Sequence, residues 1–243
     1  LFTGEELREI RAYFDDLISN VLSAEDRRNG YSIVAYHLVC RGLYDLMRTP
    51  AIVERVADLV GPDVVGWGSQ VFCKVPGDPM EVPLHQDAIY YPFTPARTVS
   101  VWIALDDVDT ENGAVEFVPG SHTLGGVAHR DVALDGTRVL DRTVAGIEDT
   151  TETFVNELRA GSASLHSDLL VHRSPPNRSN RRRAGIALRY GPASMRRVAG
   201  FDAWGGTAVP CRGPLPQWWE ACPQPDGEHP ERMADFIGVF DGN

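Results

Sequence analysis

The sequence predicts a mainly β protein, a sandwich or jelly roll with helices at one end. From Gly66 onward, short runs of β-branched and aromatic residues alternate with turn residues, and no long helical pattern separates them. These runs are WGSQVFCKV, TVSVWIAL, GAVEFVPGS, SASLHSDLLVH and AGIALRY. A chain of 243 residues, of which 43% are hydrophobic, is long enough for one domain with a large core. We therefore expect a single domain over residues 1–243.

Helical periodicity marks the N-terminal part, about residues 1–65. Thr3 followed by Glu6 fits a capping box, and apolar residues follow it at helical spacing: Leu7, Ile10, Phe14, Leu17 and Ile18. A second helical pattern runs from about Leu43 to Leu59 and stops at Gly61-Pro62. We expect the β core over about 66–192. The extension 193–243 contains a proline-rich surface segment and a short helix over PERMADFIGVF.

Composition narrows the class of partner. The net charge of −11 argues against a phosphate-neutralising nucleic-acid surface, although the run NRSNRRR at 177–183 is locally basic. No apolar segment is long enough to span a membrane, and the four cysteines form no close pair. These features favour a cytoplasmic protein that acts on a small molecule, with no nucleic-acid or membrane partner. They say nothing of the oligomeric state.

The stretch LHQDAIYYPF, residues 84–93, contains a candidate metal site. On a strand, residues two apart point to the same face, so His85 and Asp87 would converge while Gln86 faces away. An unpaired carboxylate in so aromatic a run would be costly to bury, and a metal would relieve that cost. A third ligand is needed, and SASLHSDLLVHRS offers His166 and His172. Two histidines and one carboxylate form the ligand set of non-haem Fe(II) oxygenases.

Four pieces of the chain, in order, resemble one family. They are SQVFCKVPG, PLHQDAIYYPF, SVWIALDDVDTENGAVEFVPGSH and HRSPPNRSNRRRAGIALRY. From about Gly66 to Tyr190 the chain is similar to the phytanoyl-CoA dioxygenase family of Fe(II)/2-oxoglutarate oxygenases. This resemblance implies a double-stranded β-helix, a cupin-like barrel, with flanking α-helices. It also implies Fe(II), 2-oxoglutarate and O₂ as cofactors and cosubstrates.

The resemblance assigns roles to individual residues. In the family, the second metal histidine precedes a serine by two positions and an arginine by eleven. Ser174 and Arg183 stand at those distances from His172, whereas His166 fits neither. His85, Asp87 and His172 would then hold the metal, and Arg183 with Ser174 would bind the far carboxylate of 2-oxoglutarate. Four further residues are given by the resemblance or by position: Gln70 and Trp102 at the cosubstrate, and Tyr90 and Tyr91 beside the substrate.

Other motifs in the sequence have structural or positional interpretations. His166 becomes a core histidine or a substrate neighbour, and His122, at the lip of the barrel, is read as structural. Asn112-Gly113 is a strong hairpin signal. The polar segment 123–157 is placed to act as a lid. If its acidic residues line the mouth, they would favour a polar, polyhydroxylated or amine-bearing substrate over an acyl-CoA.

With Asp87 present, the family relation favours hydroxylation, desaturation or oxidative ring closure over halogenation, with release of succinate and CO₂. The expected substrate is a small polar natural-product intermediate, with or without a sugar, and the compact length of the chain resembles that of the oxygenases that tailor sugar residues in orthosomycin-type antibiotics. The alternatives are a cupin-type isomerase or hydrolase that uses metal without 2-oxoglutarate, a non-catalytic metal-binding barrel, and a nucleic-acid binder built on the arginine run.

Overall fold

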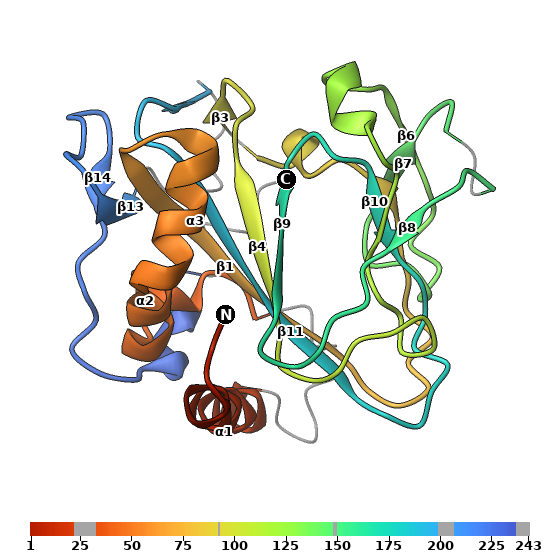
Figure 1. Cartoon of the computed structure of the whole chain (residues 1–243), viewed down its shortest axis with the longest axis horizontal. Helices are drawn as coiled ribbons and strands as arrows, with labels where there is room; N and C mark the ends of the chain where they lie inside the picture. The colour runs from red at the N-terminus through yellow and green to blue at the C-terminus, as the bar shows by residue number, and fades with distance from the viewer. Residues whose placement is uncertain (22–32, 92, 148–149, 199–206, 237–243) are drawn as a thin grey trace.

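Two facing β-sheets form the body of the protein in the computed structural model, which describes residues 1–21, 33–91, 93–147, 150–198 and 207–236 (Figure 1). The larger sheet has six strands in the order β14-β13-β1-β11-β4-β9, and the smaller has four in the order β2-β10-β5-β8. Together they form the predicted double-stranded β-helix, so the expected mainly β fold is confirmed. The bounds of the larger sheet's strands are β1 (Val64–Lys74), β4 (Val99–Ala104), β9 (Ala163–Ser167), β11 (Arg183–Pro192), β13 (Thr207–Arg212) and β14 (Glu220–Ala221). Those of the smaller sheet are β2 (Val82–His85), β5 (Glu116–Phe117), β8 (Phe154–Val155) and β10 (His172–Ser174).

Alternation along the long strands gives the larger sheet two different faces. On β11, Ile186 and Leu188 are fully buried in the core cluster under the helices, whereas Ala187 and Arg189 line a cavity on the inner face. The antiparallel register aligns Ala187 with Gln70 of β1 and with Trp102 of β4, and both of these also line the cavity. Because both faces are covered, every residue of β11 is buried.

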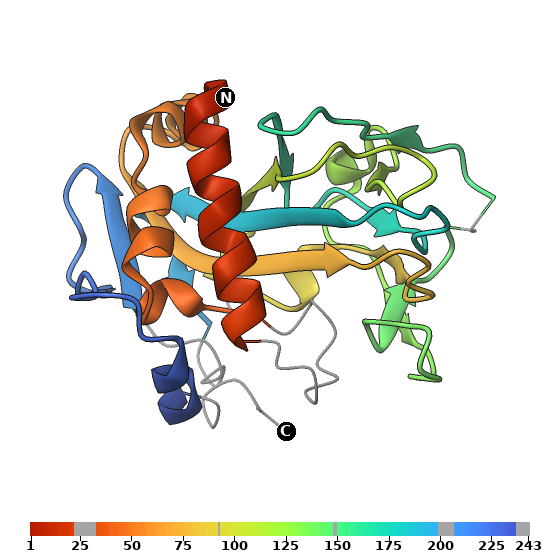
Figure 2. The same cartoon turned by 90° about the horizontal axis from the view of Figure 1, so that it is seen from below.

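Three α-helices cover the outer face: α1 (Gly4–Val21), α2 (Arg41–Met47) and α3 (Pro50–Val60). Figure 2 shows α1 crossing over β1 and β11. The capping box of α1 is confirmed. The Thr3 backbone N–H donates to Glu6 Oε2 over 2.7 Å, and the Glu6 N–H donates to Thr3 Oγ1 over 3.3 Å. Phe14 and Leu17 of α1 are buried in the core cluster that contains Ile186 and Leu188.

The expected helix over 43–59 is two helices, so this prediction was wrong in extent. Pro50 stands at the first position of α3, where its missing N–H costs nothing, but it cannot continue α2. It also pushes Thr49 out of the helical region, to φ −55° and ψ 120°. The stop at Gly61 is confirmed, since Gly61 is the C-cap of α3 with φ +105°.

Two other local predictions differ from the structure. The run SASLHSDLLVH is not one strand, because β9 and β10 lie in different sheets and a turn at 168–170 connects them. Asn112-Gly113 makes a tight turn, with Gly113 at φ +82°, but no hairpin. The Asn112 amide donates to Asp107 O and accepts from the Asp109 N–H. The turn leads from β4 in the larger sheet to β5 in the smaller one.

The remaining elements are short. A two-stranded ribbon joins β6 (His129–Asp131) and β7 (Arg142–Val144), and another joins β3 (Phe93–Thr94) and β12 (Arg196–Arg197). The 3₁₀ helices are η1 (Tyr36–Leu38), η2 (Asp87–Ile89), η3 (Ser121–Leu124) and η4 (Pro230–Phe236). The C-terminal part adds β13 to the edge of β1. In the proline-rich segment, Trp219 packs in a core cluster and Trp218 is partly exposed, so this segment does not lie wholly on the surface.

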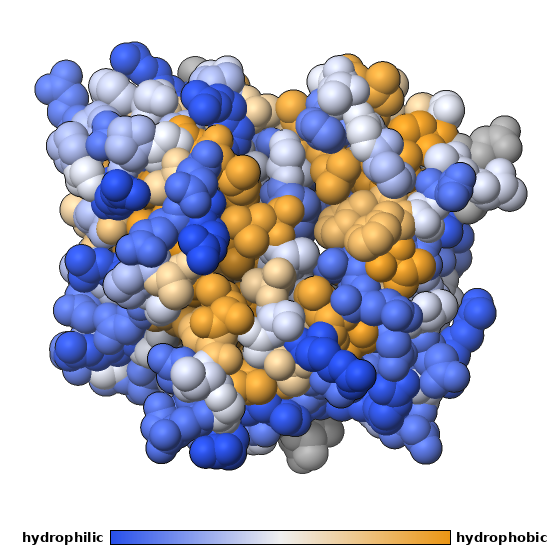
Figure 3. All heavy atoms as spheres, in the orientation of Figure 1, coloured by the Kyte–Doolittle hydropathy of each residue, from blue (hydrophilic) through white to orange (hydrophobic). Residues whose placement is uncertain are grey.

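The surface is mostly polar with a shallow apolar groove. Figure 3 shows apolar residues gathered toward the middle of the face seen in Figure 1. Leu59, Phe154 and Leu165 are exposed and line the groove. Among the described residues, no helix has the length and apolar character that crossing a membrane requires.

Candidate metal and cosubstrate site

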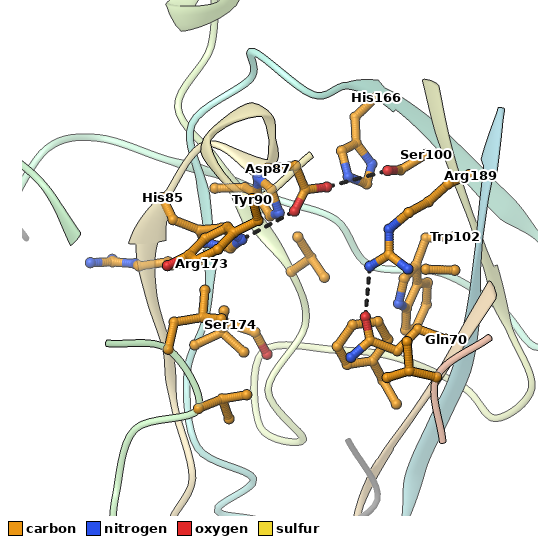
Figure 4. Close-up of a pocket in the computed structure, with 18 of the residues that line it drawn as sticks. Gln70, His85, Asp87, Tyr90, Ser100, Trp102, His166, Arg173, Ser174 and Arg189 are labelled. Atoms are coloured by element: carbon orange, nitrogen blue, oxygen red, sulfur yellow. Dashed lines mark hydrogen bonds and ion pairs between the residues drawn. The ribbon is translucent and has the colours of Figure 1, made fainter. Parts of the chain in front are cut away.

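Three predicted side chains meet between the two sheets. His85 ends β2, and His172 lies opposite it in the antiparallel register of β10, which brings the two imidazole centroids within 4.1 Å. Asp87 follows as the first residue of η2, past the end of the strand that was expected to carry it. One ligand atom from each of the three lies within 4.8 Å of the others, and Figure 4 shows His85 and Asp87 directed toward one another.

Both histidines have the tautomer that a metal ligand needs. His85 Nδ1 lies 2.9 Å from Pro83 O, and His172 Nδ1 lies 2.8 Å from Leu170 O. A carbonyl oxygen only accepts, so each Nδ1 carries the proton and each Nε2 presents a lone pair. Such a hydrogen bond is the usual way in which a protein orients a metal-ligating imidazole.

The electrostatics of the cluster favour a bound cation. Burial, and next the neighbouring His85, lower the pKa of His172 to about 3, so its imidazole is neutral. Burial acts to raise the pKa of Asp87, but its hydrogen-bonded and charged neighbours outweigh it and hold this pKa well below its usual range. His85 Nε2 lies 3.4 Å from Asp87 Oδ1, and the neutral His172 imidazole stands beside it with ring centroids 4.1 Å apart. Two imidazole nitrogens and one carboxylate oxygen that converge in this way form a donor set that fits Fe(II).

Neighbouring groups fix the position of Asp87. The Ser100 hydroxyl of β4 donates to Asp87 Oδ2 over 3.3 Å, and the Ala88 N–H donates to Asp168 O over 3.0 Å. Gln86 faces away from the metal site, as expected, but is fully buried. Its amide donates to Gly125 O and Leu169 O and accepts from the Val127 N–H. Gln86 therefore ties the metal-binding turn to the segments on either side of it.

Arg183 and Ser174 lie together in the same cavity as the metal cluster. Arg183, at 2% exposure, donates from Nη2 to Ser174 Oγ over 2.7 Å and to Gly113 O over 2.8 Å. Its guanidinium also lies 5.5 Å from the centre of the Trp102 ring. Gly185 permits this arrangement, because a Cβ there would come within 2.2 Å of the Trp102 ring. The two neighbouring arginines act elsewhere: Arg181 pairs with Asp109 and Arg182 with Asp106.

The structure also brings the other predicted residues to the cavity. Gln70, Tyr90, Tyr91 and His166 all line it, whereas His122 is exposed on η3. Burial lowers the pKa of His166 to about 4, and its ring centroid lies 5.0 Å from that of His172. Tyr91 packs edge-on against Trp67 and accepts a hydrogen bond from Arg189.

Arg189 is a charged cavity residue that sequence reasoning missed. It stands six positions after Arg183 on β11, an even number, so the strand's alternation places both guanidiniums on the inner face. The alternation in RAGIALRY therefore predicts that Arg183 and Arg189 lie on the same face of the strand. Arg189 donates from Nε to the Tyr91 hydroxyl over 2.5 Å and from Nη2 to Gln70 Oε1 over 2.6 Å, and Figure 4 shows the second of these contacts.

The segment 123–157 reaches the cavity through apolar residues. Val139 and Leu140 line it, and none of the segment's acidic residues within the described chain does; Glu148 and Asp149 lie outside the described residues. The cavity measures about 320 Å³, at the small end for ligand pockets. The acidic run therefore gives no support to an amine-bearing substrate.

Comparison with known proteins is consistent with this geometry. Residues 2–185 match the phytanoyl-CoA dioxygenase (PhyH) family. A phytanoyl-CoA dioxygenase domain-containing protein 1 of Danio rerio is 31% identical over 186 residues, covering 73% of this chain and 62% of that protein. The chain spans between 48% and 62% of the length of this and two similar curated relatives.

Solved structures share the fold. The apo form of ThoJ, a non-heme monooxygenase, is 25% identical with a TM-score of 0.77, and the match covers 97% of this chain and 85% of that one. The epimerase SnoN, solved in complex with Fe³⁺, α-ketoglutarate and nogalamycin RO, is 22% identical with a TM-score of 0.68, over 88% of this chain and 87% of that one. Because the family match spans residues 2–185, more than half of the chain, the chain belongs to the phytanoyl-CoA dioxygenase family.

Proposed function

We propose that this protein is a non-haem Fe(II)/2-oxoglutarate-dependent oxygenase. It oxidises an unactivated C–H bond of a small natural-product intermediate, by hydroxylation or oxidative ring closure, with release of succinate and CO₂. The observation that carries the proposal is the convergence of His85, Asp87 and His172 in one cavity with the Arg183–Ser174 pair. Three ligands on one face of a metal leave positions for a chelating cosubstrate and for O₂.

Each side chain has a distinct task in this proposal. The two imidazoles and Asp87 hold Fe(II), oriented by the backbone carbonyls and by Ser100 that contact them. Arg183 and Ser174 hold the far carboxylate of 2-oxoglutarate by charge-assisted hydrogen bonds. When bound, iron and 2-oxoglutarate supply the oxidising power by coupling O₂ reduction to decarboxylation of the cosubstrate.

The cavity wall determines what enters. Gln70 and Trp102 border the cosubstrate, and Tyr90, Tyr91 and His166 border the substrate. Apolar side chains complete the wall and exclude water, among them Val34, Phe72, Val139 and Leu140. A small cavity of this kind suits a compact reacting group rather than a large polyhydroxylated one. Of the substrates expected from the sequence, a small natural-product intermediate fits this cavity better than a large sugar-containing one.

The test is an anaerobic titration of the protein with Fe(II) and then with 2-oxoglutarate, followed by visible absorption. Chelation of Fe(II) by a 2-oxo acid gives a charge-transfer band that neither component has alone. We expect the band at one equivalent of iron, and we expect its loss in His172→Ala but not in His122→Ala, a histidine that is exposed outside the cluster. Iron binding without the band would contradict the proposal and favour a metal-dependent isomerase or hydrolase. No iron binding would favour a non-catalytic barrel.

A further inference from the structure

The cavity contains a second guanidinium that the proposed chemistry does not use. Arg189 is 6% exposed and lines the cavity beside the metal cluster. Its Nη1 atom is buried and has no hydrogen-bond partner among the described residues. Figure 4 shows the guanidinium pointing into the cavity above Gln70. A buried cation with an unused donor that faces a cavity indicates a ligand group there, because leaving that donor unsatisfied is costly.

The partners of Arg189 hold it in place without neutralising it. Tyr91 and Gln70 accept from Nε and Nη2, and both are neutral acceptors. Burial acts to lower the pKa of Arg189, but the Tyr91 and Asp87 side chains outweigh it, so this pKa lies above its usual value and the charge remains. Within the described chain, no carboxylate lies within ion-pair distance of Arg189. The guanidinium is therefore oriented in advance for an anion.

The charges around the cavity lead to the same conclusion. Arg173 of the lining is paired over 2.7 Å with Glu116, which stands outside the lining. The lining otherwise carries one carboxylate, Asp87, and two guanidiniums, Arg183 and Arg189. Their net charge is +1. Fe(II) and the 2-oxoglutarate dianion cancel each other and leave it unchanged. A single negative charge on the substrate would neutralise the site.

Two other polar atoms of the cavity wall could contact a negatively charged group of the substrate. The Tyr90 hydroxyl and His166 Nδ1 are buried, line the same cavity and lack a hydrogen-bond partner among the described residues. Together with Arg189 Nη1 they provide donors on the wall around the metal cluster. The rest of the lining includes apolar side chains, among them Val139 and Leu140.

We propose that Arg189 is a substrate anchor and that the substrate is a monocarboxylate whose apolar part faces Val139 and Leu140. This inference rests on the proposed oxygenase function, since it places the substrate beside iron and 2-oxoglutarate. Arg189 binds one carboxylate oxygen through Nη1, while Tyr91 and Gln70 prevent the guanidinium from turning away. Arg183 and Arg189 thus divide two carboxylates between them, one of the cosubstrate and one of the substrate.

The experiment uses matched pairs of acids and amides as probes: butyrate and butyramide, hexanoate and hexanamide, 3-phenylpropionate and 3-phenylpropionamide. Each pair has nearly the same shape and differs in charge. Calorimetry measures their binding to the full chain loaded with Ni(II) and 2-oxoglutarate, in which oxidation does not occur. We expect at least one acid to bind about tenfold or more tightly than its amide, as loss of a charge-assisted hydrogen bond predicts.

Variants assign that preference to Arg189. Arg189→Gln should abolish it, Tyr91→Phe should weaken it by freeing the guanidinium, and Arg55→Gln, which removes an exposed arginine of α3, should leave it unchanged. Thermal unfolding identifies a variant that has lost its fold. If Arg189→Gln has lost it, the acid preference of Tyr91→Phe decides: a weaker preference supports the proposal, and an unchanged one overturns it. In each variant, 2-oxoglutarate binding to the metal-loaded protein is measured separately.

Four outcomes would overturn the proposal: equal binding of every acid and its amide, binding of no acid, an acid preference that survives in Arg189→Gln, or a tenfold loss of 2-oxoglutarate affinity in that variant. The last would make Arg189 a second cosubstrate anchor. Failure of the wild-type protein to bind Ni(II) and 2-oxoglutarate together would instead contradict the oxygenase proposal itself.

Discussion

Replacement of Arg183 by glutamine should weaken 2-oxoglutarate binding and leave metal binding intact. Arg183 is not one of the three proposed metal ligands, and its Nη2 contacts to Ser174 and Gly113 hold the guanidinium in one orientation. Losing a hydrogen bond to a charged group costs about 1.5–3 kcal/mol, which corresponds to a loss of affinity of about 10- to 150-fold. The fold should tolerate the change, because Gly113 O still accepts from the Ser174 hydroxyl over 3.0 Å.

The assay titrates 2-oxoglutarate into anaerobic Fe(II)-loaded protein and follows the charge-transfer band. Arg182→Gln is the matched control, since it removes the adjacent arginine, which pairs with Asp106 and Asp15 and does not line the cavity. The reasoning is refuted if Arg183→Gln binds 2-oxoglutarate as tightly as wild type, or if Arg182→Gln loses as much affinity.

Three further predictions concern packing, pH and the first helix. Gly185→Ala should cost about 1–3 kcal/mol of stability and also weaken 2-oxoglutarate binding, because its Cβ would displace Trp102 from the Arg183 guanidinium. A wild-type unfolding temperature together with wild-type 2-oxoglutarate affinity would contradict this. Burial lowers the pKa of His37 to about 3 and that of His166 to about 4, so the unfolded chain binds more protons. The metal-free protein should therefore lose stability as pH falls from 6.5 toward 4, by up to about 1.4 kcal/mol per pH unit for each histidine. Burial raises the pKa of Asp168 to about 6, which offsets part of this loss. In denaturant unfolding, the free energy of unfolding of His37→Gln should depend less steeply on pH than that of wild type, and an equal slope would contradict the assignment. Thr3→Ala should lower the free energy of unfolding by about 1 kcal/mol through loss of the α1 capping box. The same denaturant unfolding measures this, and an unchanged denaturant midpoint would contradict it.

Sequence patterns predicted the parts of this protein that depend on local chemistry. The capping box at Thr3, the helix end at Gly61 and the β-strand over AGIALRY each follow from residue types within a few positions of one another. The break at Pro50 was also readable, since proline cannot occupy a helix interior, but the apolar periodicity on both sides concealed it.

Properties that depend on distant contacts were not predicted. Asn112-Gly113 forms the expected turn, but only the partners of β4 and β5 decide that these strands lie in different sheets. His172 was preferred to His166 through family spacing, and the structure gives the physical difference: His172 is in register with His85, whereas His166 is opposite Ser100 on β4. Arg189 was overlooked because its significance comes from its contacts with Tyr91 and Gln70.

The most direct test of the metal site is an anomalous-difference map from a crystal of the protein grown with Ni(II) and 2-oxoglutarate. We predict one strong peak bonded to Nε2 of His85, Nε2 of His172 and a carboxylate oxygen of Asp87, with 2-oxoglutarate extending from the metal to Arg183. A peak elsewhere, coordination through either Nδ1, or 2-oxoglutarate bound away from Arg183 would contradict the account.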